Sequence, residues 1–310
     1  RVGPERNRRR RSRLRLSTRV QVSSLRTHGM PPGMALDRSI AFIGAGNMAG
    51  ALIRGLLGTN TVAPERIVAS DVDTARLEVL GSELGIRTST DNAEAVRGAD
   101  VVVLATKPQV LAQALPGVAA ALEPDALLIS IAAGVSSKLI ERLSPEGARV
   151  VRTMPNTPAL VGAGATAIAA GTHATPSDLD LAETLFRSVG VCVRVPEAQI
   201  DAVTGLSGSG PAYVFATIEA LRDAGVREGL EEELALTLAS QTVYGAARLL
   251  LEQDESPATL RERVTSPGGT TRAGLDALAS AGFADTIAGA VRAATRRSVE
   301  LREIAEGDAD

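Results

Sequence analysis

One segment of the sequence is suited to holding a small anion: Ser-Pro-Gly-Gly-Thr-Thr at residues 266–271, directly ahead of a helix-like stretch. A glycine turn at the start of a helix exposes several backbone N–H groups, which bind carboxylates well. Thr271 adds a hydroxyl group at the same place. The plainer interpretation of this segment is a helix cap that holds no ligand.

A second segment is suited to a phosphate group. The apolar run 40–43 leads into Gly-Ala-Gly-Asn-Met-Ala at residues 44–49. Gly44 permits a tight turn, and Gly46 lets backbone N–H groups approach a pyrophosphate at the start of a helix. At the first strand–helix junction of the chain, this pattern favours a dinucleotide site over a purely structural turn. The residues predicted to contact the cofactor here are Gly44, Ala45, Gly46, Asn47, Met48 and Ala49.

The acid Asp71 bears on the choice of cofactor, because it follows the second strand-like run. An acid at this position can accept a hydrogen bond from the ribose 2′-OH and repel a 2′-phosphate, which favours NADH. Ser70 and Arg76 could still accommodate NADPH, and Asp71 could simply lie at the start of the next helix. The sequence therefore predicts NADPH or NADH as cofactor without deciding between them.

Two further loops follow strand-like runs and are expected at the same edge of the sheet, where doubly wound folds bind ligands. They are Ala-Thr-Lys-Pro at residues 105–108 and Ala-Ala-Gly at residues 132–134. Lys107 and Lys138 are the two lysines of the chain, and a functional role is favoured for Lys107 because of its place in such a loop. The loops add Ala105, Thr106, Lys107, Pro108, Ala132, Ala133 and Gly134 to the predicted cofactor contacts.

The sequence is poor in the proton donors that a ketone reductase on this scaffold would use. After residue 28 the one histidine is His173, in a loop expected at the surface, and no lysine follows Lys138. Hydride reduction of a carbonyl group creates an alkoxide, so a well-placed acid matters greatly. An imine nitrogen can already carry its proton when the hydride arrives. The residue inventory therefore favours an iminium substrate over a ketone.

Length, charge and cysteine content limit the class of protein. A chain of 310 residues is expected to form two domains, and its single cysteine, Cys192, excludes an internal disulfide and a multi-cysteine metal site. Residues 1–29 hold ten arginines and one acid, whereas the rest has 23 basic and 35 acidic residues. An acidic body argues against a nucleic-acid partner, and no apolar run approaches the roughly 20 residues of a membrane span. We expect a cytoplasmic protein without a metal.

The arginine-rich residues 1–37 are set apart from the fold. Their composition also fits a nucleic-acid arm or a transit-type peptide. A disordered extension, or a true start at Met30 or Met34, is favoured because the periodic apolar pattern begins only at Ile40.

Short apolar runs alternate with helix-like stretches from residue 39 onward, which indicates βαβ units and a parallel sheet covered on both faces. The expected strands are 39–43, 66–70, 86–88, 100–105, 127–131 and 149–152, with edge strands at 165–170 and 191–195. The expected helices are 48–57, 74–84, 109–121, 137–143 and 177–189. Residues 38–198 are therefore predicted to form a Rossmann-like, doubly wound dinucleotide-binding domain.

The remaining residues, 199–310, show helical spacing of alanine and leucine without strand signals. The expected helices are 211–224, 231–251, 257–263, 271–279 and 283–306. Such helices can bury a face against a second subunit, so we predict an all-α domain for substrate binding and dimerisation. The glycine-rich residues 201–213 at its start fit either a ligand site or a close helix crossing. The predicted fold class is thus α/β with a C-terminal all-α domain.

Several of these motifs together resemble the pyrroline-5-carboxylate reductases. The resemblance spans residues 39–306 and rests on the motifs at 44–49, 107–108, 154–158 (Met-Pro-Asn-Thr-Pro), 207–213 and 266–271. It implies the reduction of (S)-1-pyrroline-5-carboxylate to L-proline, the last step of proline biosynthesis, with NADPH or NADH. It also implies an interlocked homodimer of the helical domains, often assembled into a decamer.

The resemblance further implies roles for individual residues. The substrate would be held by Ser266, Gly268, Gly269, Thr270 and Thr271, and Thr271 would bond the ring nitrogen as the catalytic residue. Glu197 would be a substrate-contacting acid. Asn92 would contact the cofactor, as Ser70 and Asp71 are also predicted to do. Asp71 departs from the Ser/Asn-Arg pattern of many NADPH-preferring members, and the arginine-rich head has no counterpart in the family.

Two rival functions remain open at this point. One is another reductase on the same scaffold, acting on a different cyclic imine or on a hydroxy acid. The other is a coenzyme-sensing or nucleic-acid-binding protein that uses the arginine-rich head as its arm.

Overall fold

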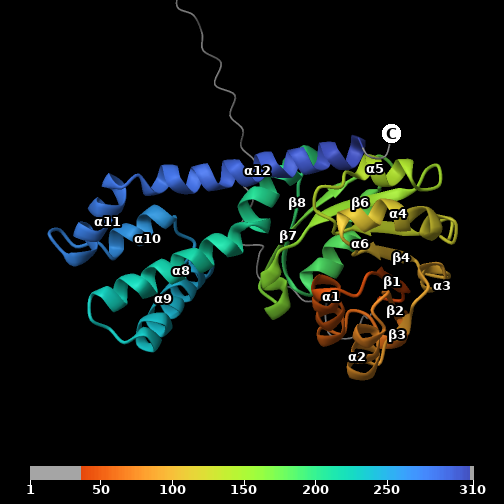
Figure 1. The fold of residues 1–310 in the computed structure, drawn as a ribbon, viewed down its shortest axis with the longest axis horizontal. Coiled ribbons are helices and arrows are strands. Elements are labelled where there is room, and N and C mark those ends of the chain that lie inside the picture. The colour runs from red at the N-terminus through yellow and green to blue at the C-terminus, as the bar shows by residue number, and fades with distance from the viewer. Residues whose placement is uncertain (1–35, 308–310) are drawn as a thin grey trace, which may run out of the picture.

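The computed structural model describes residues 36–307, so the predicted extension 1–37 lies almost wholly outside the described residues. Figure 1 shows two parts: a sheet layered between helices, and an arm of helices that extends away from it. The predicted fold class, a Rossmann-like α/β part followed by an all-helical part, is confirmed.

A single eight-stranded sheet runs through the first part, in the order β3-β2-β1-β4-β5-β6-β7-β8. Neighbouring strands pair in parallel except β6 and β7, which are antiparallel. The strand order reverses between β1 and β4, the switch point at which open α/β sheets bind ligands. The strands are β1 (Ile40–Ile43), β2 (Ile67–Ser70), β3 (Arg87–Ser89), β4 (Val101–Leu104), β5 (Leu127–Ser130), β6 (Arg149–Met154), β7 (Gly164–Ala170) and β8 (Gly190–Arg194).

Helices cover both faces of the sheet because its central strands are apolar on both. In β1, Phe42 belongs to one core cluster and Ile43 to the other, and both are at most 1% exposed. Two-sided burial explains why these strands read as continuous apolar runs. The first cluster includes α1 (Asn47–Gly58), α2 (Thr74–Leu84) and α6 (Pro176–Arg187), and the second includes α3 (Asn92–Val96), α4 (Pro108–Ala119) and α5 (Ser137–Arg142).

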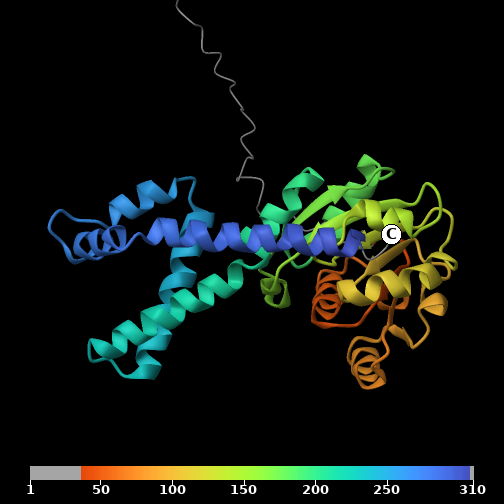
Figure 2. The same cartoon turned by 45° about the horizontal axis from the view of Figure 1, so that its top comes forward.

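The helical arm is joined to the sheet part at its first helix and by its long last helix. It comprises α7 (Ile200–Val203), the π-helix η5 (Thr204–Gly208), α8 (Gly210–Arg227), α9 (Glu232–Glu252), α10 (Pro257–Arg263), α11 (Thr270–Ser280) and α12 (Phe283–Gly307). Helix α12 starts beside α11 at the outer end of the arm and ends next to α5 on the sheet part (Figures 1 and 2). There the Nη2 of Arg142 donates a hydrogen bond of 3.3 Å to the carbonyl oxygen of Glu306.

Close packing explains the glycine-rich residues 201–213. A Cβ atom on Gly205 would lie 2.8 Å from the carbonyl oxygen of Val291 and would collide with Thr295, both on α12. A Cβ atom on Gly208 would collide with the end of the Met154 side chain. Of the two interpretations of this segment, the structure therefore supports the close helix crossing.

Several element boundaries differ from the prediction. Helix α3 was not predicted, since five residues are too few to show a helical period; Asp91 caps it by accepting the N–H of Ala93 at 2.8 Å. Arg66, predicted to begin a strand, lies in the 3-10 turn η2 (Pro64–Arg66). The domain boundary at 198/199 stays a prediction, and Ile200 beyond it still packs on the sheet with 1% of its surface exposed.

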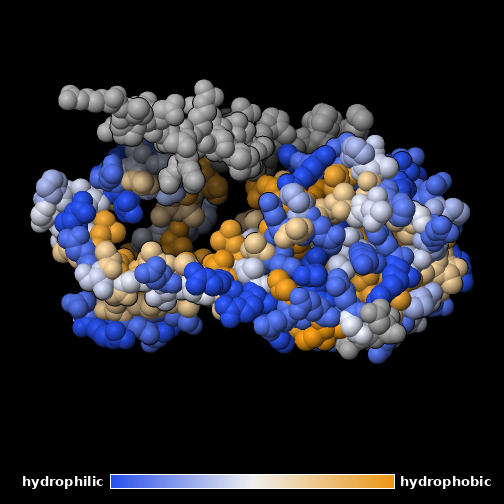
Figure 3. All heavy atoms as spheres, turned by 90° about the horizontal axis from the view of Figure 1, so that it is seen from above, coloured by the Kyte–Doolittle hydropathy of each residue, from blue (hydrophilic) through white to orange (hydrophobic). Residues whose placement is uncertain are grey.

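Much apolar surface stays exposed on the arm. Among the described helices, α9 is long and apolar enough to cross a membrane by length and composition alone, and 11% of that stretch is buried in the single chain. Orange hydrophobic spheres are visible near the middle of the molecule, where the arm meets the sheet part (Figure 3). The large exposed apolar side chains of α8 and α9 include Val214, Phe215, Leu234, Leu238, Tyr244 and Leu251.

Candidate active site

The glycine turn after β1 contains two glycines with different roles. The fold requires a glycine at position 44, whereas Gly46 leaves space for a ligand. Gly44 has a φ of +98°, and a Cβ atom there would lie 2.8 Å from the carbonyl group of Ala105. Gly46 has a φ of −68°, which any residue can adopt, and no described atom lies within 4 Å of its Cβ position. Gly44 therefore serves the fold, whereas the space beside Gly46 is open to a ligand.

Helix α1 begins at this open space with unpaired donors. Its N-cap, Gly46, offers no side-chain hydrogen bond, and the first intrahelical bond runs from the N–H of Gly50 to the oxygen of Gly46 at 2.9 Å. The N–H groups of Asn47, Met48 and Ala49 are thus left for a ligand, which is how helix starts bind phosphate. The side chain of Ala49 is 1% exposed and packs in the first core cluster.

Two polar groups line the end of β2 next to this turn. Asp71 accepts a hydrogen bond from the N–H of Ala45, with 2.8 Å between Oδ2 and N. Ser70 is fully buried, and its hydroxyl donates to Oδ1 of Asn92 at 2.7 Å. The Ser70 hydroxyl therefore fixes the amide of Asn92, which is part-exposed, and a contact of Ser70 with the cofactor stays a prediction.

The loops after β4 and β5 lie at the same edge of the sheet, because Ile43 pairs with Leu104, and Leu104 with Ser130. In the first loop, Thr106 Oγ1 is buried and has no hydrogen-bond partner among the described residues. Lys107 is exposed and precedes α4. In the second, Ala133 is exposed. The structure thus brings the predicted residues of 105–108 and 132–134 to the edge that holds the glycine turn.

The turn at residues 266–271 has the shape predicted for an anion site. The N–H of Gly269 donates to the oxygen of Ser266 at 3.1 Å, and Gly268 has a φ of +66°, as in a type II turn with Pro-Gly at its centre. A Cβ atom on Gly269 would collide with the Ser266 hydroxyl. Helix α11 follows without a side-chain cap. Its first N–H groups, from Thr270 onward, are therefore available to a carboxylate.

The two halves of the site are far apart within one chain. Helices α10 and α11, which flank the 266–271 turn, lie at the outer end of the arm, whereas the glycine turn lies in the sheet part (Figures 1 and 2). Each half has its own helix start without a side-chain cap, at α1 and at α11. A single chain thus does not bring Thr271 next to the predicted cofactor edge.

Glu197 lies in the turn η4 (Glu197–Gln199), directly before α7, and takes part in a network of hydrogen bonds. Its carboxylate accepts the N–H and the hydroxyl of Ser137 at 2.8 Å and 2.5 Å, and it pairs with Arg152 at 3.2 Å. Both of its oxygens are therefore engaged in holding the start of α5 and the end of the sheet. The side chain is 28% exposed, and a carboxylate oxygen can accept more than one hydrogen bond, so a substrate contact by Glu197 stays a prediction.

Comparison with known proteins decides the family. A family described as pyrroline-5-carboxylate reductase dimerisation matches residues 197–301, and one described as NADP oxidoreductase coenzyme F420-dependent matches residues 39–134. A pyrroline-5-carboxylate reductase from Methanosarcina acetivorans is 49% identical over 265 residues, which are 86% of this chain and 98% of the relative. The chain belongs to the pyrroline-5-carboxylate reductase family.

Solved structures of the family agree with this reductase along most of its length. The pyrroline-5-carboxylate reductase from Coxiella burnetii superimposes with a TM-score of 0.82 at 41% identity, covering 85% of this chain and 98% of that one. The pyrroline carboxylate reductase from Plasmodium falciparum, solved with NADP bound, gives 0.77 at 30% identity, covering 87% and 100%.

The residues of this reductase fit a nicotinamide dinucleotide. The open side of Gly46 and the uncapped start of α1 suit a pyrophosphate, and the neighbouring loop holds the buried hydroxyl of Thr106, which has no hydrogen-bond partner within residues 36–307. Asp71 lies at the end of β2, beside the glycine turn. The groups that would hold the cofactor are thus backbone N–H groups of the first turn and the side chains of Asp71 and Thr106, which follow β2 and β4.

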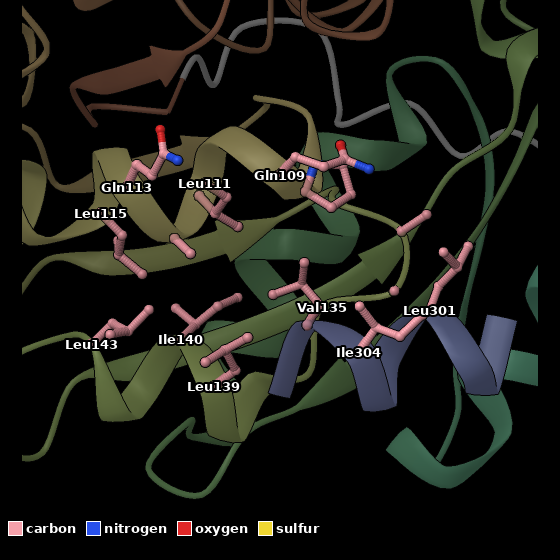
Figure 4. A pocket seen from close by; sticks show the side chains of 15 residues that line it. Gln109, Leu111, Gln113, Leu115, Val135, Leu139, Ile140, Leu143, Leu301 and Ile304 are labelled. Atoms are coloured by element: carbon pink, nitrogen blue, oxygen red, sulfur yellow. The ribbon is translucent and has the colours of Figure 1, made fainter. Parts of the chain in front are cut away.

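One contact of the reductase was not foreseen from the sequence. A pocket of about 310 Å³ next to the cofactor loops is lined by α4, α5 and the end of α12 (Figure 4). Leu301 of α12 packs on Gly134, so that a Cβ atom on this glycine would lie 3.2 Å from that of Leu301. The helix that carries the arm thus touches the 132–134 loop, and no local sequence signal points to this long-range contact.

Proposed function

We propose that this reductase transfers a hydride to the imine carbon of (S)-1-pyrroline-5-carboxylate and releases L-proline, at a site formed by two copies of the chain. One observation carries the proposal: a pyrophosphate cradle at the sheet edge and an uncapped, glycine-flanked carboxylate turn occur in the same chain. NADPH or NADH, when bound, supplies the hydride.

The substrate turn orients the substrate. The backbone N–H groups at the start of α11 hold its carboxylate, and the hydroxyl of Thr271 bonds the ring nitrogen. The ring reacts as the iminium: the hydride forms the new C–H bond, the C=N π bond breaks, and its electron pair becomes the lone pair of the amine. No proton has to be delivered during this step. Orientation and electrostatics then supply most of the rate.

Two copies are needed because the turn of one chain does not reach its own cofactor edge. The exposed apolar residues of α8 and α9 favour pairing of two arms, and the family match to a dimerisation domain covers them. Pairing of interlocked arms would bring the 266–271 turn of each copy to the cofactor edge of the other. We propose a homodimer of this kind, assembled further into a decamer.

A mixed dimer tests this arrangement. Gly46→Val blocks the pyrophosphate cradle, and Thr271→Ala removes the hydroxyl at the substrate turn, so each variant alone is expected to be inactive or severely slowed. When both variants are co-expressed, about half of the dimers are mixed, and each mixed dimer has one intact site out of two if the site is shared between copies. About one quarter of the wild-type activity should then return. Refolding or mixing controls with each variant alone must stay inactive. No recovery in verified mixed dimers would contradict the shared site.

The remaining partners follow from the same proposal. The small-molecule substrate and the second copy of the chain account for both the substrate turn and the apolar arm, so we assign neither a nucleic acid nor a membrane. We place the enzyme in the cytoplasm, where its one cysteine, the buried Cys192, stays reduced.

A further inference from the structure

We infer that Asp71 makes this reductase prefer NADH to NADPH. The inference rests on the proposed function, because it concerns which of the two coenzymes the site accepts better. The sequence alone left both open, since Ser70 and Arg76 accompany Asp71 at the end of β2.

Asp71 is fixed in one orientation at the border of the glycine turn. Its Oδ2 accepts the N–H of Ala45 at 2.8 Å, and its Oδ1 accepts the N–H of Asp73 at 3.0 Å. The side chain is 14% exposed. A carboxylate held by two backbone groups and largely buried does not swing away when a ligand arrives.

This place is the one that the adenosine ribose takes in a dinucleotide-binding sheet. With the pyrophosphate on the start of α1, the ribose lies beside the end of β2, where an acid accepts a hydrogen bond from its 2′-OH. Each oxygen of Asp71 keeps a further lone pair for such a bond. A 2′-phosphate has no comparable proton to donate, and it would place its negative charge beside a fixed carboxylate.

Arg76 is the cation that could reverse this preference, because an arginine near the ribose accommodates the 2′-phosphate in NADP-binding folds. Its guanidinium lies 3.7 Å from Asp71 Oδ2 and 3.7 Å from Asp73 Oδ2. One positive charge is therefore shared between two carboxylates. Ser70, the other residue that could have favoured NADPH, is fully buried and bonded to Asn92. The balance at the ribose position is thus negative.

Direct titration of the full chain with each coenzyme, without substrate, measures the preference by calorimetry. We expect NADH to bind at least about tenfold more tightly than NADPH, which corresponds to about 1.4 kcal/mol. Equal affinity, or tighter binding of NADPH, would overturn the inference while leaving the coenzyme site intact. If neither coenzyme binds, the coenzyme site of the proposed function fails together with the inference.

Two matched variants separate Asp71 from general charge effects. Asp71→Asn keeps the size of the side chain and one acceptor oxygen but removes the charge, so the Kd of NADPH should fall by about tenfold. Asp73→Asn removes the same charge two residues away, from a half-exposed position, and should change that Kd by less than about threefold. Circular dichroism confirms that both variants are folded. Equal effects of the two variants, or no effect of Asp71→Asn, would contradict the role of Asp71.

Discussion

Arg152 and Glu197 form an ion pair at the junction of the two parts, with 3.2 Å between Nη1 and Oε1. The arginine side chain is 3% exposed, and its other nitrogen lies 3.7 Å from Asp201. Asp201 in turn accepts the hydroxyl of Ser298 at 2.7 Å and pairs with Arg302, both on α12. A chain of charged groups therefore ties the last helix to the sheet and sets where the arm leaves it.

Removal of Arg152 should destabilise the reductase strongly. Arg152→Leu leaves Glu197 and Asp201 without their buried partner, so we expect the free energy of unfolding to fall by about 2–4 kcal/mol in urea titrations. Arg54→Leu is the control, since its pair with Glu83 joins two half-exposed side chains and should contribute less than about 1 kcal/mol. Similar losses for the two variants would show that the junction network is not a special source of stability.

The two glycines of the first turn should fail in different ways. Gly46→Val meets no described atom and keeps a permitted φ, so the variant should fold normally but lose coenzyme binding. Gly44→Ala forces a side chain onto a left-handed backbone and against Ala105, at a cost of about 1–3 kcal/mol or more. Thermal unfolding and coenzyme titration of both variants provide the check. Normal coenzyme affinity in Gly46→Val would contradict the pyrophosphate cradle.

The hydroxyl of Thr271 should matter for the chemical step and not for the coenzyme. Thr271→Ala removes one hydrogen bond that we place at the reacting ring nitrogen, so kcat should fall by about 100-fold. Thr271→Ser keeps the hydroxyl and should retain most of the activity. Steady-state kinetics and coenzyme titration separate the two effects. A Thr271→Ala variant with wild-type kcat would remove Thr271 from the mechanism.

Cys192 should resist thiol reagents in the folded protein. It is 4% exposed, and burial, reinforced by Glu183, raises the pKa of its thiol to about 12. Because the thiol holds its proton more tightly in the folded protein, it contributes stability that is fully present below the ordinary thiol pKa of 9.0. This contribution to the free energy of unfolding is lost as the pH rises from there toward 12. At pH 8 we expect alkylation of Cys192 only after unfolding, with activity unchanged by the reagent. Rapid labelling of the native enzyme would show that β8 opens readily.

The layered fold could be predicted because its signals are local. Strands β1, β4 and β5 are buried on both faces, so their sequences are continuous apolar runs. The glycine turn at residue 44 indicates the first strand–helix junction. Helix α3 is too short to show a period, and the antiparallel direction of β7 depends on a connection through η3 (Thr157–Val161) rather than on its own residues.

The site could be predicted in its parts but not in its assembly. The glycines ahead of a helix at 44–49 and at 266–271 are enough to predict a phosphate site and a carboxylate site from the sequence. The buried place of Ser70 and the pairing of Glu197 with Ser137 and Arg152 depend on residues far away in the sequence, which no local pattern reveals. The distance between the two halves of the site likewise follows from the length of α12 and the direction of the arm.

The most direct test of the reductase assignment is turnover of (S)-1-pyrroline-5-carboxylate by the full chain, followed as NADH or NADPH oxidation with L-proline measured as product. The account predicts steady turnover, with one coenzyme oxidised for each proline formed and a severe loss in Thr271→Ala. No proline formation by a protein that demonstrably binds coenzyme would contradict the proposed reaction.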